Sequence, residues 1–399
     1  MKLLLKIVIA IAAGIGAGFV LPDWLTRLFM TFNGIFSEFL GFLIPLLIVG
    51  FVAPAISEIG RKAGTMLGAT VAIAYGMTFG AGMLSFATAE AVFPHLLGGV
   101  RLAEASLAAE ASPALSPYFT LEIEPLTSVM TALVLAFVLG FGGAMLPGAT
   151  TLRGALGDFR AVIRLVIERA IIPLLPVYIF GIFLSMAIAG IVGPILLTFA
   201  KIIAVIFVLH VGVLVVQYGI ASLFSGKNPF RSLWTMIPAY FTALGTQSSA
   251  ATIPVTLART EAMGVSKPVA GFVVPLCATI HMSGSTLKIV ACAIALMTVK
   301  GMPVEAGAFA GFIAMLGITI VAAPGVPGGA IMASLGLLSS MLGFSESDNA
   351  LMIALYIAMD SFGTACNITG DGAIAQITDR LFRQKTAPET AVDPQLTDN

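Results

Sequence analysis

The residues with the clearest chemical potential form a polar stripe in the last apolar stretch of the chain, which includes the motif MDSFGTACNITGD from residue 359. The stripe consists of Asp360, Thr364, Asn367 and Asp371. On a helix these positions fall within about 40° of one face, since each residue advances the helix by about 100°. Carboxylates inside a membrane span are costly and mark functional sites. We therefore expect the stripe to face the protein interior and to bind a substrate or a cation.

The composition indicates that this stripe belongs to a membrane protein. Of the 399 residues, 58% are hydrophobic and 10% are charged, whereas soluble domains carry about 25% charged residues. The formal net charge is zero, which gives no indication of a nucleic-acid partner. The cysteines lack metal-site spacing and are expected to be buried free thiols: Cys277, Cys292 and Cys366.

Eight stretches are apolar and long enough to cross a bilayer, which takes about 20 residues in a helix. They are residues 3–20, 34–57, 65–95, 126–147, 160–190, 194–222, 267–299 and 346–378. Lys and Arg concentrate on one side of these spans, so the positive-inside rule places both termini in the cytoplasm. We expect a single unit over residues 1–385 in the cytoplasmic (inner) membrane, followed by a disordered tail at 386–399.

Three breaks interrupt apolar stretches in the second half of the chain: residues 246–254 (TQSSAATIP), 281–285 (HMSGS) and 322–330 (AAPGVPGGA). A break frees backbone N–H and C=O groups, which must then be buried in protein or line a wet cavity. Paired interruptions of this kind indicate the binding site of a secondary transporter. The adjacent hydroxyls of Ser248 and Ser249 strengthen this interpretation of the first break. A tight turn between ordinary helices remains the alternative for residues 322–330.

Four motifs, in this order, resemble the dicarboxylate/amino acid:cation symporter family, the prokaryotic relatives of glutamate transporters. They are TQSSAATIPVT, ATIHMSGS, APGVPGGAIM and MDSFGTACNITGD. The resemblance implies an all-α membrane protein with eight transmembrane helices, two re-entrant helical hairpins and an elevator-type transport mechanism. It also implies a homotrimer in contact with membrane lipid. The scaffold would comprise mainly 1–64 and 126–190, and the transport domain mainly 65–95 and 194–378.

The same resemblance implies roles for individual residues. Asp360 would bind the amino group of the substrate, while Thr364 and Asn367 would supply further polar ligands. Asp371 would coordinate sodium with help from Asn367. The α-carboxylate of the substrate would be approached by Ser248, Ser249 and the second hairpin tip, Val326–Gly328.

Departures from the family pattern bear on the substrate. Gly363 stands where members that take acidic substrates have an arginine, and no arginine occurs between Arg259 and Arg380. A buried side-chain carboxylate without a cationic partner is strongly disfavoured, so we expect a neutral amino acid. The alternative is an acidic amino acid or dicarboxylate, with Lys288 replacing the missing arginine.

Other departures concern the coupling ion. Ser283 replaces a sodium-binding aspartate and His281 replaces an asparagine, so Na⁺ and H⁺ both remain open as coupling ions. Lys288 would act as a tethered cation in place of a sodium ion, or else extend its ammonium to the membrane surface. We expect no organic cofactor.

Other function classes fit the sequence less well. A substrate-gated channel needs a continuous pore with rings of selecting groups, whereas the stripe lies between two broken segments. An intramembrane protease needs two carboxylates that share a proton, but Asp360 and Asp371 are about 16 Å apart along one helix. His281 beside Ser283 lacks the context of a serine hydrolase. A non-transporting receptor would tolerate the loss of Asp371, which a coupled symporter would not.

Overall fold

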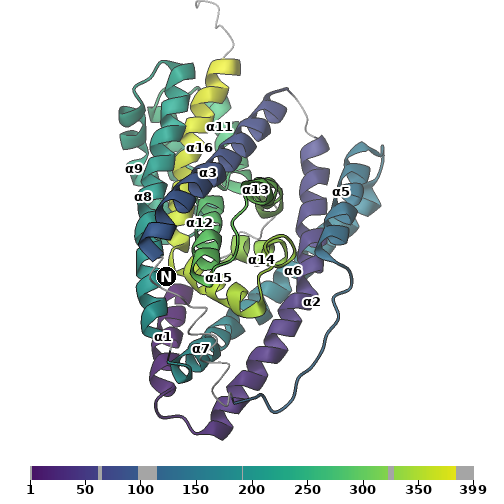
Figure 1. Ribbon diagram of the computed structural model, residues 1–399. Coiled ribbons are helices and arrows are strands. Elements are labelled where there is room, and N and C mark those ends of the chain that lie inside the picture. Colours follow the sequence, from purple (N-terminus) through teal and green to yellow (C-terminus); the bar gives the residue numbers. More distant parts are fainter. Residues whose placement is uncertain (1, 62–64, 98–114, 191, 322–327, 383–399) are drawn as a thin grey trace, which may run out of the picture.

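The computed structural model describes residues 2–61, 65–97, 115–190, 192–321 and 328–382, and the regular structure in these ranges is entirely helical (Figure 1). The first helices are α1 (Lys2–Ala17), α2 (Asp23–Arg61), α3 (Thr65–Leu97), α5 (Val129–Met145), α6 (Thr150–Val166), the π-helical turn η1 (Ile167–Ile171), α7 (Ile172–Ile188) and α8 (Val192–Ser225). They are followed by α9 (Pro229–Thr246), α10 (Ser249–Ala262), α11 (Lys267–Ile280), α12 (Ser283–Lys300), α13 (Ala306–Val321), α14 (Gly329–Leu342), α15 (Glu346–Ala358) and α16 (Asp360–Phe382).

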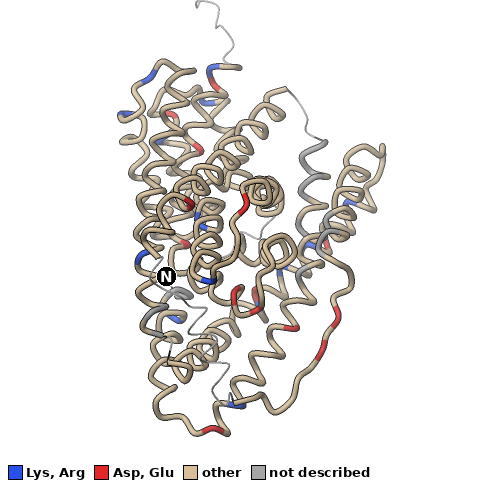
Figure 2. Tube along the Cα trace, in the orientation of Figure 1, with Lys and Arg blue, Asp and Glu red and all other residues tan. Residues whose placement is uncertain are grey.

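The helices confirm the prediction of an all-α protein that spans a membrane several times. Five helical segments in the described part of the chain are long and apolar enough to cross a bilayer: Asp23–Pro54, Thr65–Leu97, Thr150–Ile188, Leu196–Ser225 and Lys267–Lys300. The pair α15 and α16 makes a sixth if it is taken as one bent span. Figure 2 shows that charged residues are sparse along these helices. The expected total of eight spans stays a prediction.

The contacts between the helices fall into two groups. In the first, α2 packs against α5, α6 and α7, and α1 packs against α7. In the second, α16 packs against α8, α9, α10 and α11, while α12 packs against α3. Contacts of α14 with α2 and of α15 with α1 join the two groups.

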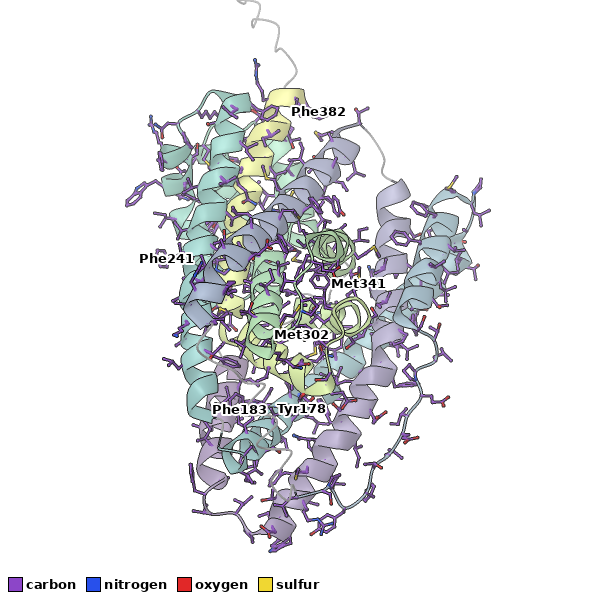
Figure 3. All side chains as sticks on the ribbon, viewed as in Figure 1. Tyr178, Phe183, Phe241, Met302, Met341 and Phe382 are labelled. Atoms are coloured by element: carbon purple, nitrogen blue, oxygen red, sulfur yellow. The ribbon has the colours of Figure 1, made fainter. Side chains whose placement is uncertain are left out.

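Burial distinguishes the helices that hold the polar stripe from those at the surface. Every described residue of α12 from Ser283 to Met297 is buried, and α16 is buried over most of its length. Side chains fill the space between the helices around Met302 and Met341 (Figure 3). At the periphery, Phe241 points away from the molecule and is 63% exposed. An exposed aromatic ring on an apolar helix is suited to contact with lipid.

Two of the predicted breaks are confirmed. Gln247 separates α9 from α10 with a left-handed backbone (φ 54°), and residues 281–282 separate α11 from α12. Of the third break, residues 322–327, Val326 included, lie outside the described residues. Gly328 precedes α14 with φ 78°, a conformation that glycine adopts without steric cost.

The predicted last span, residues 346–378, is not one straight helix, although the whole polar stripe lies on its second part. Its helical path bends by 63° at Met359, so that α15 ends at Ala358 and Asp360 is the first residue of α16. The sequence gives no sign of this bend because the residues before Asp360 are apolar and include no glycine or proline. The bend has a functional consequence, since it places a carboxylate at a helix start.

Candidate substrate and ion site

The carboxylate of Asp360 lies between the start of α16, the start of α14 and the middle of α12. Its Oδ2 accepts a hydrogen bond from the Gly328 N–H at 2.9 Å, and its Oδ1 lies 3.5 Å from Lys288 Nζ. The Asp360 side chain is 11% exposed, whereas that of Lys288 is fully buried. Asp360 is therefore the more accessible member of an ion pair that lies next to Gly328, at the end of the third break.

Lys288 is held by several groups besides Asp360. Its ammonium donates to the Met359 carbonyl at 3.3 Å and lies 3.6 Å from the ring centre of Tyr356, a cation–π arrangement. The alternative that Lys288 extends to the membrane surface is wrong, because its buried side chain ends at the start of α16.

Gly363 makes room for this lysine. A Cβ atom at Gly363 would lie 2.5 Å from both Nζ and Cε of Lys288. That separation is shorter than van der Waals contact, so a larger residue at position 363 requires the lysine to move. The position that the family resemblance assigned to an arginine thus adjoins the ammonium of Lys288.

Asn367, one further turn along the stripe, ties α16 to the start of α12. Its Oδ1 accepts from the Gly284 N–H at 2.7 Å, and its Nδ2 donates to Ser285 Oγ at 3.1 Å. The first N–H groups of a helix have no acceptor within the helix, and Asn367 Oδ1 supplies an acceptor for one of them in α12. Tyr356 donates its hydroxyl to the same Ser285 Oγ at 3.0 Å.

The second carboxylate of the stripe pairs with a histidine. His281 Nδ1 lies 2.9 Å from Asp371 Oδ1 and 3.1 Å from the Asn367 carbonyl oxygen. On the other edge of the ring, His281 Nε2 contacts Ser283 Oγ, which also accepts from Gln217 Nε2 at 2.7 Å. Both side chains of the His281–Asp371 pair are fully buried.

Two oxygen atoms in this cluster are free to bind a cation. Asp371 Oδ2 and Gln217 Oε1 are buried and lack a hydrogen-bond partner among the described residues. Free carboxylate and amide oxygens suit a hard cation such as Na⁺. However, His281 faces oxygens of both residues that the family pattern implies as sodium ligands, namely Asp371 Oδ1 and the Asn367 carbonyl oxygen.

The predicted site residues thus divide into two clusters and a separate turn. Gly328, Asp360, Gly363 and Lys288 form the first cluster; Asn367, Asp371, His281 and Ser283 form the second. Thr364 Oγ1 donates to the Asp360 carbonyl at 3.1 Å, a contact within its own helix. Ser248 caps α10 and accepts from the Ala251 N–H at 3.3 Å, and Ser249 begins that helix. Their contact with a substrate stays a prediction.

Sequence reasoning missed Gln217 on α8 and Tyr356 on α15. A signal existed for both, because each is a polar residue within a predicted apolar span. Their partners could not be assigned, since Gln217 meets Ser283 across 66 positions and Tyr356 meets Ser285 across 71.

Comparison with known proteins adds an independent line of support. Residues 3–381 match the sodium:dicarboxylate symporter family. The chain is 30% identical to the neutral amino acid transporter B(0) of Rattus norvegicus over 172 residues, which are 42% of this chain and 31% of that protein. It is 32% identical to excitatory amino acid transporter 2 of Homo sapiens over 160 residues, or 40% and 28% of the two chains. The match thus spans about a third of these two mammalian proteins.

A bacterial relative aligns over its whole length. The chain is 26% identical to the serine/threonine transporter SstT of Acinetobacter baumannii strain ATCC 17978 over 402 aligned positions, covering 97% of this chain and 98% of that protein. The family and these relatives confirm the expected class, a transporter rather than an enzyme. The chain belongs to the sodium:dicarboxylate symporter family.

Proposed function

We propose that this protein is a cation-coupled symporter that imports a small amino acid. The observation that carries the proposal is Asp360, a buried carboxylate whose side chain stays 11% exposed beside the N-terminus of α14. A fixed anion binds an ammonium group, and the N–H groups at a helix start bind a carboxylate. An amino acid presents these two groups together. The printed names of the relatives, which include serine/threonine and neutral amino acid transporters, agree with such a substrate.

A neutral amino acid is the first candidate substrate. Among the described residues, Lys288 is the only basic side chain paired with Asp360. Because this pairing already balances the charge of Lys288, no further cation is at hand for a side-chain carboxylate of the substrate. An acidic amino acid or a dicarboxylate is the second candidate. The position of the Lys288 ammonium beside Gly363 favours this second candidate. There the ammonium would be able to pair with the side-chain carboxylate of an acidic substrate.

The coupling ion is proposed to be Na⁺ or H⁺. The free oxygens Asp371 Oδ2 and Gln217 Oε1 and the family match support Na⁺. The contact between His281 and Asp371 supports H⁺, because a histidine beside a carboxylate is a group that exchanges protons.

The elevator mechanism fits the two helix groups. In this proposal residues 1–64 and 126–190 form the scaffold, and residues 65–95 and 194–378 form the transport domain. The packing of α2 against α5 to α7, and of α16 against α8 to α11, supports the division. We further propose a homotrimer in the cytoplasmic membrane, surrounded by lipid, with both termini in the cytoplasm.

Uptake into proteoliposomes tests the proposal. The purified protein is reconstituted, and radiolabelled L-serine, L-alanine, L-aspartate and succinate are each offered under an inward Na⁺ or H⁺ gradient. Gradient-driven uptake of serine or alanine supports a neutral amino acid, whereas uptake of aspartate or succinate favours the second candidate. Absence of uptake of all four contradicts the proposal.

A further inference from the structure

The ammonium of Lys288 is buried next to the carboxylate that is proposed to bind the substrate's amino group. Its side chain is fully buried and the ammonium lies 3.5 Å from Asp360 Oδ1. The Met359 carbonyl at 3.3 Å and the Tyr356 ring at 3.6 Å complete its surroundings. A buried cation needs such partners, because it is costly to remove from water without them.

The order of the groups matters. Asp360 is 11% exposed and Lys288 is not exposed at all, so Asp360 is the member of the pair that a ligand can reach. Asp360 Oδ2 accepts from the Gly328 N–H. Both carboxylate oxygens are therefore occupied without any ligand, one by a tethered cation and the other by the residue that precedes α14.

The chain provides the space that this arrangement requires. A Cβ atom at Gly363 would lie 2.5 Å from Lys288 Nζ, so an alanine at this position already displaces the ammonium. Lys288 and Gly363 thus form a matched pair on neighbouring helices.

We infer that Lys288 is a tethered ammonium that competes with the amino group of the substrate for Asp360 and keeps the site of the empty carrier neutral in charge. This inference rests on the proposed amino acid transport. The ammonium of an amino acid offers the same charge and the same N–H donors as Lys288. Substrate binding then exchanges one cation for another at Asp360, while Lys288 keeps the Met359 carbonyl and the Tyr356 ring.

The exchange of partners predicts a specific kinetic signature. Net uptake requires the empty carrier to return across the membrane, whereas exchange of internal for external substrate does not. Without Lys288, the empty carrier must return with an uncompensated buried carboxylate, which is costly. A bound amino acid supplies its own ammonium, so the loaded carrier is spared this cost. Loss of Lys288 should therefore slow net uptake but spare exchange.

The test is Lys288→Met in proteoliposomes with radiolabelled L-serine, or with L-aspartate if the wild-type protein carries only that. Removing the competitor should raise the apparent substrate affinity about tenfold and lower the ratio of net uptake to exchange about tenfold, as expected for the loss of one close charge contact. Gly363→Ala, which displaces the ammonium without removing it, should shift both quantities in the same direction. The matched control is Lys300→Met on the same helix, whose partner is Asp348 at 2.7 Å. This control should leave both quantities unchanged.

The contrary results are distinct. If Lys288→Met and Gly363→Ala do not raise the apparent substrate affinity, Lys288 does not compete with the substrate. If they reduce exchange and net uptake equally, Lys288 has no special role in the return of the empty carrier. Either result overturns the inference. If the wild-type protein neither takes up nor exchanges any amino acid, the proposed function fails first and the inference fails with it.

Discussion

His281 Nδ1 lies 2.9 Å from Asp371 Oδ1, so that a histidine ring faces the carboxylate to which the family pattern assigns a sodium ion. Both side chains are fully buried, and the second oxygen of Asp371 has no hydrogen-bond partner among the described residues. This contact connects the start of α12 with the middle of α16, and it occupies one of the two oxygens of Asp371.

Replacing His281 should change the coupling ion. In His281→Asn the ring no longer faces Asp371, and the amide oxygen adds a ligand that a hard cation favours. We expect uptake to become more dependent on Na⁺, with a half-saturating Na⁺ concentration about tenfold lower, and less dependent on an inward H⁺ gradient. Uptake rates measured against Na⁺ concentration at fixed pH check this. If both His281→Asn and Asp371→Asn keep the Na⁺ dependence of the wild-type protein, the coupling cation does not bind at Asp371.

Sequence reasoning anticipated the parts of this site that depend on local chemistry. The breaks at Gln247 and at His281 were visible because polar and small residues interrupt apolar stretches. The stripe from Asp360 to Asp371 was visible because one face of a helix follows from a spacing of 3.6 residues per turn. Family resemblance supplied the roles that spacing alone leaves open.

The parts that escaped prediction depend on tertiary contacts. The bend at Met359 occurs in an apolar segment, so only packing reveals it. Whether Lys288 reached the site could not be decided from sequence, because the outcome depends on the space left by Gly363 on another helix. Gln217 was overlooked for the same reason, since its partner Ser283 is remote in sequence.

Removing the Asp360 carboxylate should weaken amino acid binding and the fold together. Asp360→Asn cannot pair with a substrate ammonium, and it leaves the buried Lys288 without its counter-ion. Truncating one member of a buried charge pair costs about 2–5 kcal/mol, so apparent affinity for the transported amino acid should fall at least 30-fold. Binding to purified protein measures this. Asp348→Asn, which removes a carboxylate paired with Lys300 outside the site, serves as control. Intact affinity in Asp360→Asn contradicts the assignment of the amine ligand.

Stability should reveal the pairing of these charges independently of transport. Lys288→Met and Asp360→Asn should each lower the unfolding temperature, because each leaves one buried charge alone. The double variant Lys288→Met/Asp360→Asn should be more stable than the sum of the two effects predicts, with a coupling of about 1–3 kcal/mol. Thermal unfolding in detergent provides the measurement. Strict additivity would mean that the two groups do not interact in the folded protein.

An arginine at position 363 should confer acidic substrate specificity only if Lys288 is removed. In Gly363→Arg the new Cβ meets the lysine at 2.5 Å, and two cations then compete for the same space. We expect poor folding and no uptake of L-aspartate from this single variant. In Gly363→Arg/Lys288→Met the guanidinium has room and provides the bidentate partner that a side-chain carboxylate needs. Uptake of radiolabelled L-aspartate should then appear, and its absence from a well-folded double variant would contradict this account of specificity.

Close packing between α12 and α16 predicts that Gly284 tolerates no side chain. A Cβ atom there would lie 2.7 Å from both the Gly363 carbonyl oxygen and Cys366 Cβ, so neither helix can yield without moving the residues of the site. Overpacking a core typically costs about 1–3 kcal/mol, and Gly284→Ala should lower the unfolding temperature accordingly. The Asn367 contact at the same N–H should weaken as well, which would reduce substrate affinity. Gly271→Ala in α11 is the control, because a Cβ atom at Gly271 meets nothing within 4 Å. Equal unfolding temperatures for the two variants would show that α12 and α16 can separate without cost, contrary to the packing that holds Asn367 and Lys288 in place.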